Sequence, residues 1–229
     1  MRRPRVLIVD DDLAIIKFLR ANLKAEGYET LTALDGAQAL ETVERELPDL
    51  IILDIMLPNM DGFELCQRLR KWSQIPIIML SASGDEQDKV KCLNLGADDY
   101  VSKPFSVSEL TARVRAVFRR TQNTTAPAQP LFSCGDLQID FVHRKVTVAE
   151  KEIKLTPTEF SLLQELALNA GKVLTHTQLL QRAWGPEYMT ERDYLHTFIG
   201  RLRAKIEPDR TPKYITTVSG VGYQFKTST

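Results

Sequence analysis

Three runs in the first half of the chain are apolar at nearly every position, and they constrain the fold more than any other feature. They are residues 5–9 (RVLIV), 50–53 (LIIL) and 75–80 (IPIIML). A strand that is apolar on both faces has to be covered on both sides, which is typical of a parallel sheet with helices above and below. Two weaker runs lie at 29–33 and 100–101. Helical patterns follow the five runs at 13–25, 36–46, 61–72, 85–95 and 107–120, so we expect an α/β, (βα)5 doubly wound domain.

The pattern changes after residue 121. Residues 121–130 (TQNTTAPAQP) carry no charge and no large apolar side chain, which predicts an extended linker. Beyond it, short strands at 131–155, helices at 157–169, 175–184 and 190–206, and a hairpin of 214–218 with 223–226 predict an α+β winged helix. We therefore expect domains at 1–121 and 131–229, joined by a linker at 122–130.

Composition adds little beyond the class of protein. The first 121 residues hold 17 basic and 19 acidic side chains, and the remainder 13 and 11, a weak asymmetry in favour of nucleic-acid binding by the second half. No apolar run approaches the roughly 20 residues that span a bilayer. The start lacks a signal-peptide cleavage pattern. The three cysteines are widely spaced, which predicts reduced thiols and a cytoplasmic location without membrane association.

Polar residues follow four of the five predicted strands. Because the carboxyl ends of parallel strands meet at one edge of the sheet, these side chains should surround a single crevice. Carboxylates so close together repel one another and need a cation. Mg²⁺ is the ion that fits, since it prefers oxygen ligands and accepts a phosphate oxygen. The strand-end residues are Asp10, Asp11, Asp54, Ser81 and Lys103.

The chemistry expected of this crevice is phosphoryl transfer. Asp54, at the centre of the sheet, is the expected nucleophile and would form an aspartyl phosphate. Asp10, Asp11 and the Met56 carbonyl would hold Mg²⁺ with it, while Lys103 stabilises the transferring group and Ser81 binds the finished phosphoryl group. A single strand-end aspartate is more often a helix cap, as we expect for Asp12. Five matching residues at four strand ends favour the phosphoryl site.

The motifs VLIVDDD, DLIILDIMLPNMDG, IIMLSA and GADDYVSKPF closely resemble the receiver domain of two-component response regulators, across residues 4–121. The resemblance implies a sensor histidine kinase as phosphodonor. It also implies a switch in which Ser81 moves toward the phosphate while Tyr100 changes rotamer, and a cis Lys103–Pro104 peptide.

In the OmpR/PhoB family, which the chain resembles, the region from GADDYVSKPF onward forms a two-fold dimer after phosphorylation. The resemblance implies a homodimer held by intermolecular pairs of Lys89 with Glu109 and of Asp99 with Arg113. A mixed charged face is otherwise usually solvated surface, with each pair contributing under about 1 kcal/mol.

The second half, with LTPTEFSLLQELALNAGKVLTHTQLLQRAWG, YLHTFIGRLRAKIE and YITTVSGVGYQF, resembles the winged-helix effector domain of the same family over residues 131–226. The resemblance implies that the helix at 190–206 enters the major groove of promoter DNA while the hairpin reaches the minor groove. Arg201 and Thr197 would read base edges, and Arg203, Lys205 and Thr217 would bind phosphates. The remaining expected DNA-facing positions are His196, Gly200 and Ser219.

Two departures from the family pattern concern DNA contacts. Many relatives carry arginine where Ser219 stands, and a bulkier, often basic residue where Gly200 stands. The loop 185–190 lies where the family often contacts RNA polymerase. WGPEY with YLHTFIGRLR is most similar to a subgroup linked to potassium-transport genes.

The sequence thus predicts a phosphorylation-dependent transcription regulator rather than an enzyme. One alternative is a phosphatase or another small-molecule α/β enzyme. Against it, Asp54 is followed by Ile-Met-Leu without the second aspartate of haloacid-type phosphatases, and no P-loop or dinucleotide loop occurs. Another alternative is a DNA-binding protein whose first domain dimerises independently of phosphate.

Overall fold

The computed structural model describes residues 2–82, 85–122, 130–207 and 214–227. It folds into two compact units, Met1–Arg115 and Ala116–Thr229. The helix α5 (Val107–Gln122) continues past the end of the first unit. Most of the predicted linker, residues 123–129, lies outside the described residues. No helix within the described ranges is long and apolar enough to cross a bilayer.

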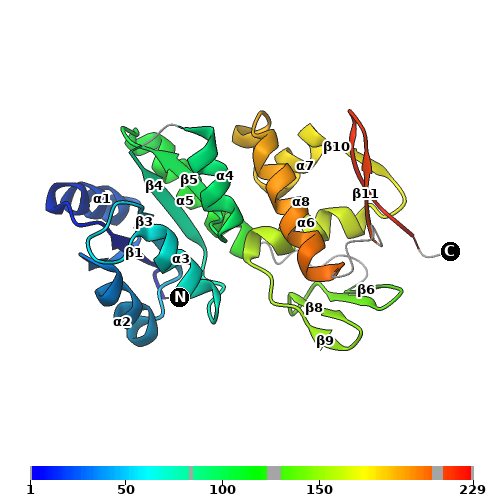
Figure 1. Ribbon diagram of the computed structural model, residues 1–229, viewed down its shortest axis with the longest axis horizontal. Coiled ribbons are helices and arrows are strands. Elements are labelled where there is room, and N and C mark those ends of the chain that lie inside the picture. The colour runs from blue at the N-terminus through cyan, green and yellow to red at the C-terminus, as the bar shows by residue number, and fades with distance from the viewer. Residues whose placement is uncertain (1, 83–84, 123–129, 208–213, 228–229) are drawn as a thin grey trace. The chain divides into compact units, whose positions relative to one another are not determined.

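A parallel five-stranded sheet forms the first unit, as predicted (Figure 1). Its strand order is β2-β1-β3-β4-β5, the doubly wound arrangement. The strands are β1 (Arg5–Val9), β2 (Glu29–Ala33), β3 (Leu50–Asp54), β4 (Ile77–Ser81) and β5 (Asp99–Ser102). The helices before α5 are α1 (Leu13–Ala25), α2 (Gly36–Glu46), α3 (Gly62–Arg70) and α4 (Glu86–Asn94).

Both faces of this sheet are buried, which explains why its central strands are apolar at every position except at their ends. Alternate residues such as Leu7, Ile51 and Ile77 form one core with buried side chains of α2, α3 and α4. The residues between them, such as Ile8 and Ile52, are equally buried. β4 begins two residues later than predicted. Pro76 has no N–H to donate to a neighbouring strand, and its carbonyl instead accepts from Ile51 N at 2.9 Å.

The second unit contains two antiparallel sheets and three α-helices. The sheet β6-β7-β8-β9 comprises Leu131–Cys134, Leu137–Asp140, Lys145–Val148 and Lys151–Glu152. The helices are α6 (Pro157–Leu168), α7 (His176–Ala183) and α8 (Arg192–Ile206), with a short 3₁₀ turn, η1, at Pro186–Tyr188 before α8. The last sheet has the order β10-β12-β11, formed by Val173–Thr175, Gly222–Phe225 and Ile215–Val218.

Two details of the second unit differ from the sequence prediction. β10 was not predicted, because three residues are too few to show an alternating pattern; it pairs with β12 and makes the predicted hairpin a three-stranded sheet. α8 begins at Arg192, two residues later than predicted, since residues 186–191 form the 3₁₀ turn and its exit. The three helices and the terminal hairpin otherwise follow the prediction.

Candidate functional site

The carboxyl edge of the parallel sheet brings the predicted acids together. Oxygen atoms of Asp10, Asp11 and Asp54 all lie within 4.8 Å of one another. Asp10 directly follows β1 and is fully buried, Asp54 ends β3 and is 4% exposed, and Asp11 is exposed. They line an open depression of about 660 Å³, together with Met56 and Lys103. Asp12 is a helix cap, as predicted: its side chain accepts from Ala14 N at 2.7 Å.

Lys103 bridges the two buried acids. Its Nζ lies 2.9 Å from Asp10 Oδ2 and 3.1 Å from Asp54 Oδ2. Burial lowers the pKa of Lys103, but the hydrogen bond to Asp10 and the charges of Asp54 and Asp10 outweigh it, so the pKa is raised. For Asp54, burial has the opposite effect and raises the pKa of the carboxyl group. The charge of Lys103 lowers this pKa, whereas the charge of Asp10 raises it further. The ammonium group thus compensates for only part of the negative charge in the crevice.

One oxygen of Asp54 has no partner in the described part of the chain. Asp54 Oδ1 is buried and accepts no hydrogen bond from any described residue, while Oδ2 is held by Lys103. A buried carboxylate oxygen without a partner is costly unless a cation or a reaction partner completes it. The backbone around it is tightly packed: a Cβ on Gly62, the first residue of α3, would lie 2.2 Å from Asp54 O. Only glycine permits this approach, so Gly62 helps to position the end of β3.

The two predicted switch residues are in direct contact. The Ser81 side chain forms a hydrogen bond with Tyr100, which is 6% exposed. Burial raises the pKa of Tyr100, and the hydrogen bond to Ser81 opposes the shift. Ser81 also connects to the acidic crevice through its carbonyl, which accepts from Lys103 N at 2.6 Å. The Lys103–Pro104 peptide is cis, as expected from the resemblance.

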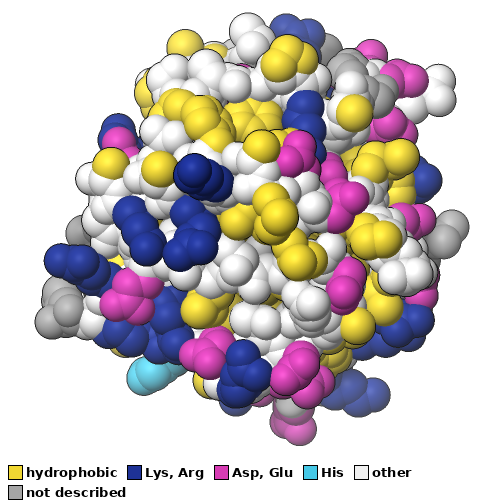
Figure 2. Space-filling model, turned by 90° about the vertical axis from the view of Figure 1, so that its left-hand side faces the viewer, with side chains coloured by type: hydrophobic (Ala, Val, Ile, Leu, Met, Phe, Trp, Pro, Cys, Tyr) yellow, Lys and Arg dark blue, Asp and Glu magenta, His cyan; other side chains and the backbone are white. Residues whose placement is uncertain are grey.

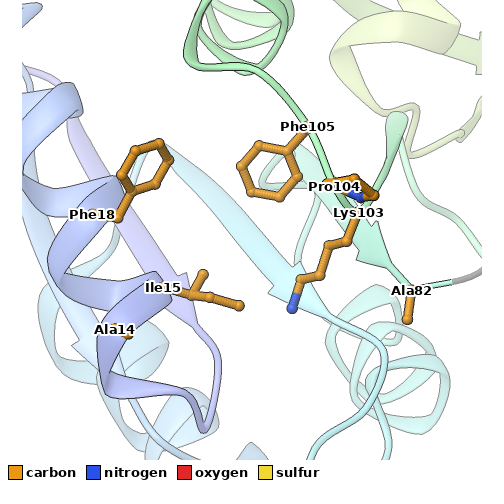
Figure 3. Close-up of a pocket in the computed structure, with 7 residues that line it drawn as sticks. All are labelled: Ala14, Ile15, Phe18, Ala82, Lys103, Pro104 and Phe105. Atoms are coloured by element: carbon orange, nitrogen blue, oxygen red, sulfur yellow. The ribbon is translucent and has the colours of Figure 1, made fainter.

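An apolar pocket of about 550 Å³ adjoins the acidic depression, and Lys103 and Ile15 line both. Figure 3 shows Ile15 and Phe18 from α1 on one side, and Pro104 and Phe105 from the segment after β5 on the other. Leu13 and Phe18 of α1 are 67% and 45% exposed. Figure 2 shows one face of the molecule, where apolar side chains lie exposed between acidic and basic ones.

Three of the four charged residues expected at a dimer interface pair with one another within one chain. Arg113 Nη1 lies 2.9 Å from Asp99 Oδ1, and Arg113 Nη2 lies 3.3 Å from Glu109 Oε1. Asp99 is fully buried and Arg113 is about one-fifth exposed. An intermolecular bond between Asp99 and Arg113 would therefore have to replace an existing intramolecular one. Lys89 lies on α4 and is half-buried.

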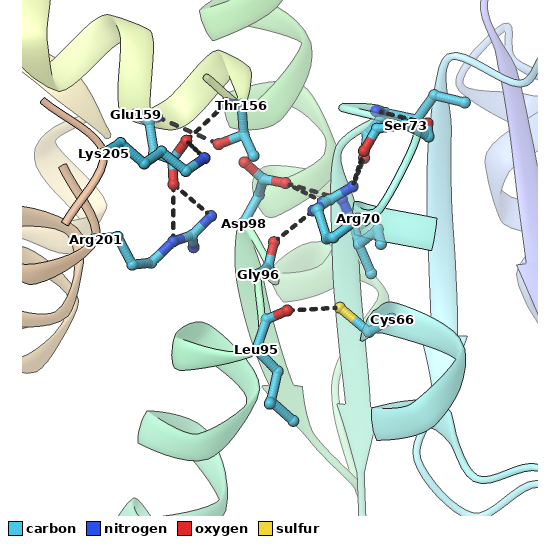
Figure 4. A network of polar contacts seen from close by, with 12 residues as sticks. Cys66, Arg70, Ser73, Leu95, Gly96, Asp98, Thr156, Glu159, Arg201 and Lys205 are labelled. Atoms are coloured by element: carbon cyan, nitrogen blue, oxygen red, sulfur yellow. Dashed lines mark hydrogen bonds and ion pairs between the residues drawn. The ribbon is translucent and has the colours of Figure 1, made fainter. Parts of the chain in front are cut away.

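A second polar cluster, inside the effector unit, changes the interpretation of α8. Glu159 of α6 is fully buried, and its Oε1 accepts from Arg201 Nε at 2.9 Å and pairs with Arg201 Nη2 at 2.8 Å (Figure 4). Lys205 Nζ lies 2.6 Å from Glu159 Oε2. We call Glu159, Arg201 and Lys205 the Glu159 cluster. The Arg201 side chain is only 10% exposed, so the base contact expected from the sequence, which stays a prediction, would have to replace part of this ion pair. Lys205 is likewise tied to Glu159.

The exposed side of α8 includes His196 and Gly200, two of the positions expected to face DNA. The exposed positions recur every four residues, at Arg192, His196, Gly200 and Ala204, with Thr197 half-buried beside them. A Cβ on Gly200 would meet no atom within 4 Å. This stripe, rather than the side carrying Arg201, is the part of α8 that is open to a partner.

The remaining predicted DNA contacts lie near the hairpin. Arg203 Nη2 donates to Ile215 O and to Thr217 Oγ1, both at 2.9 Å, and so joins α8 to β11. Thr217 and Ser219 are exposed. The sequence reasoning missed Glu159, whose capping box with Thr156 was a visible signal in LTPTE. It also missed Tyr223, whose hydroxyl lies 2.7 Å from His196 Nδ1.

Together, the acidic strand-end crevice on a doubly wound sheet and the winged helix after it define a receiver domain joined to a DNA-binding effector domain. Comparison with known families agrees. Residues 6–115 match the response regulator receiver domain, and residues 150–225 match the C-terminal domain of transcriptional regulatory proteins. The chain belongs to the OmpR/PhoB family of response regulators.

Similar proteins span the whole chain. The KDP operon transcriptional regulatory protein KdpE of Escherichia coli strain K12 is 46% identical, over 96% of this chain and 98% of the relative. The response regulator MprA of Mycobacterium sp. strain KMS is 42% identical over 96% of both chains. Among solved structures, that of a RitR mutant has a TM-score of 0.81 and 29% identity, covering 98% of this chain and 100% of that one.

This membership settles the class of function. The chain is a phosphorylation-dependent transcriptional regulator that works with a histidine kinase and binds DNA, and it is not a metabolic enzyme. The enzymatic alternative raised by the acidic crevice is therefore excluded.

Proposed function

We propose that Asp54 is the phosphoacceptor of this regulator. The observation that carries the proposal is Asp54 Oδ1, which is buried at an open depression and bonds to no described residue, while Oδ2 is fixed by Lys103. A carboxylate with one oxygen anchored and the other unpaired is oriented for attack on phosphorus. The O–P bond forms at Asp54 as the P–N bond to a phosphohistidine of the kinase breaks, and the histidine nitrogen keeps the electron pair.

Mg²⁺ is the cofactor that suits this crevice. The donor set consists of carboxylate oxygens within 4.8 Å of one another, and hard oxygen ligands are the ones Mg²⁺ prefers. Asp10, Asp11, Asp54 and the Met56 carbonyl are the groups proposed to hold it. When bound, the ion would neutralise charge that develops on the phosphoryl oxygens. Lys103 would stabilise those oxygens from the other side, since its ammonium already contacts both buried acids.

The signal is proposed to leave the crevice through Ser81 and Tyr100. Their hydrogen bond places the hydroxyl that would bind the phosphoryl group against the ring that would change rotamer. Movement of Ser81 toward Asp54 breaks that bond and frees Tyr100. Phosphorylation would then promote homodimerisation through the surface carrying Lys89, Asp99, Glu109 and Arg113, with Arg113 exchanging its intramolecular partners for those of a second copy.

The effector half is proposed to insert α8 into the major groove of promoter DNA. The exposed stripe of α8, with Thr197 beside it, would face the bases, and Arg203, Thr217 and Ser219 near the hairpin would lie close to the backbone and minor groove. The proposed contact with RNA polymerase is the loop 185–190. We propose domain limits of 1–121 and 131–229.

The regulated genes are proposed to include potassium-transport genes. The basis is the similarity to KdpE over nearly the full length, whose printed name refers to the KDP operon. MprA is almost as similar to this chain, so sequence similarity alone does not identify the regulated genes and they have to be identified by experiment. Footprinting of the phosphorylated protein on genomic DNA should protect a site upstream of a potassium-transport operon; protection confined to other promoters would contradict this assignment.

The phosphoacceptor is tested by labelling with acetyl phosphate and Mg²⁺. We expect wild type to take up one phosphoryl group, Asp54→Ala to take up none, and beryllofluoride to strengthen dimerisation and DNA binding only when Asp54 is present. The matched control is Asp12→Ser, which lines the same depression but keeps a helix-capping side chain; it should be labelled like wild type. An Asp54→Ala protein that still dimerises and binds DNA in response to its kinase would refute the proposal.

A further inference from the structure

Two of the three histidines of the chain lie side by side on the DNA-binding unit. His176 is the first residue of α7, and His196 lies in the middle of α8. Their ring centroids are 5.6 Å apart. Tyr223 of β12 contacts both: its ring centroid is 5.8 Å from that of His176, and its hydroxyl is 2.7 Å from His196 Nδ1. Two helices and the hairpin thus meet at a pair of imidazoles, which we call the His176–His196 pair.

The pair opens onto the exposed stripe of α8. His196 belongs to that stripe, with Arg192 one turn before it, and His176 is half-buried behind it, whereas Tyr223 is buried. The Tyr223 hydroxyl and His196 Nδ1 form a hydrogen bond in which the tautomer of a neutral His196 decides which atom donates, whereas a protonated imidazole donates to the hydroxyl oxygen. The contact involves Nδ1, and among the residues that the structure describes none bonds to Nε2, which leaves this nitrogen for an outside partner.

The groups around the pair are basic or neutral. Burial lowers the pKa of His176, and the nearby His196 and Arg192 lower it further. Arg203, on the same helix, lies 5.9 Å from the centroid of the Tyr223 ring. Within the described ranges no carboxylate forms an ion pair with either histidine. This includes Asp193, the acid nearest to them in sequence. In contrast, the third histidine, His143, contacts Asp140 Oδ2 at 2.8 Å. An anion would therefore complete the His176–His196 pair.

We propose that His176 and His196 bind a phosphate group of the DNA backbone, and that their protonation makes the DNA affinity of this regulator increase as the pH falls. The inference rests on the proposed placement of α8 in the major groove, which brings this stripe against the duplex. In free protein the basic surroundings disfavour a charged His176, whereas a phosphate favours it. DNA binding therefore takes up protons over the range near pH 6.5 in which histidine ordinarily titrates.

The test measures DNA affinity against pH at constant ionic strength. The full-length protein, activated with beryllofluoride and Mg²⁺, is titrated onto a fluorescent duplex that it has selected from a random-sequence pool. Wild-type affinity should increase about fivefold from about pH 8 to about pH 6. The double variant His176→Asn, His196→Asn should lose most of this increase, and His143→Asn is the matched control that should retain it. Thermal melting of each variant checks folding.

The double asparagine variant also removes the side-chain contacts of the two imidazoles, so a second pair of variants tests the role of the charge separately. His176→Arg and His196→Arg each place a permanent cation at the site, so their affinity at about pH 8 should exceed that of wild type and depend less on pH. The inference is overturned if the double asparagine variant keeps the full pH dependence, or if wild-type affinity does not change with pH. Beryllofluoride-dependent binding without pH dependence would refute this inference alone, whereas absence of any beryllofluoride-dependent binding would refute the proposed function as well.

Discussion

Replacing Arg201 by alanine should destabilise the effector domain rather than alter how it reads DNA. The change removes two contacts to the buried Glu159 Oε1, at 2.9 and 2.8 Å. A hydrogen bond to a charged group contributes about 1.5–3 kcal/mol. Lys205, at 2.6 Å, and Thr156 N, at 2.8 Å, still hold Glu159 Oε2. The expected loss is therefore about 2–3 kcal/mol, below the roughly 3–5 kcal/mol for leaving a buried charge wholly unpaired.

The assay uses the two tryptophans of the chain. Trp72 is 44% exposed in the receiver, whereas Trp184 is fully buried in the effector unit, with its ring 5.1 Å from that of Phe198 on α8. In a Trp72→Phe background, Trp184 fluorescence reports unfolding of the effector half alone. Urea titration of the full-length protein then gives the free energy of unfolding of this half with and without Arg201.

A double-mutant cycle separates the ion pair from other effects of truncation. Arg201→Ala, Glu159→Gln and the double variant should give a coupling energy of about 2 kcal/mol. Arg192→Ala is the matched control, because Arg192 is an exposed arginine on the same helix; it should shift stability by less than about 0.5 kcal/mol. If Arg201→Ala unfolds like its parent but loses sequence discrimination, then Arg201 reads bases and the structural role is refuted.

Three further predictions concern the receiver crevice. Because burial raises the pKa of Asp54 above its ordinary 3.8, the charged side chain destabilises the fold at neutral pH. Asp54→Asn should therefore increase the free energy of unfolding by about 1 kcal/mol at neutral pH, and this increase should vanish below the ordinary pKa of the carboxyl group. Urea titrations at several pH values measure it. A stabilisation that grows in acid would contradict the argument. Gly62→Ala should cost about 2–4 kcal/mol and slow acetyl phosphate labelling, since its Cβ would lie 2.2 Å from Asp54 O; unchanged melting and labelling would refute the steric argument. Asp11→Asn should raise the Mg²⁺ concentration needed for labelling about tenfold without changing the melting temperature, because Asp11 is exposed, and chelation with EDTA should stop labelling of wild type; labelling that persists in EDTA would exclude the metal.

The acidic crevice was predictable because its geometry follows from strand direction alone. Parallel strands end at the same edge, so polar residues after residues 9, 53 and 80 must converge, whatever the helices do. The runs 6–9, 50–53 and 77–80 were visible because burial of both faces leaves no polar position within them. An error of one or two residues at a strand end did not matter, since Asp54 and Ser81 are the last residues of β3 and β4 and still point to that edge.

The pairing of Arg201 with Glu159 was not predictable from the pattern of α8. Successive residues of a helix are rotated by about 100°, so the boundary between buried and exposed sides depends on what packs there. Arg201 is drawn inward by Glu159, which lies 42 positions earlier in the chain, and no pattern within 190–206 reveals that partner. The same limit hid the His176–His196 pair, because its members come from different helices and are joined by Tyr223 of the hairpin.

The contacts in the crevice also indicate why the proposed switch lies at the ends of β4 and β5 rather than inside the sheet. A phosphoryl group on Asp54 would add about −1.5 to −2 charges beside Asp10 and Asp11. Lys103 already contacts Asp10 and Asp54 through its ammonium group. Lys103 N donates to Ser81 O at 2.6 Å, and the Ser81 side chain contacts Tyr100. The added charge is therefore linked to Tyr100 by two hydrogen bonds, from Lys103 to Ser81 and from Ser81 to Tyr100. The sheet core, where residues such as Ile52 and Ile78 are fully buried, resists displacement because close-packed side chains have no alternative positions, so the response is confined to polar strand ends whose hydrogen bonds can be exchanged.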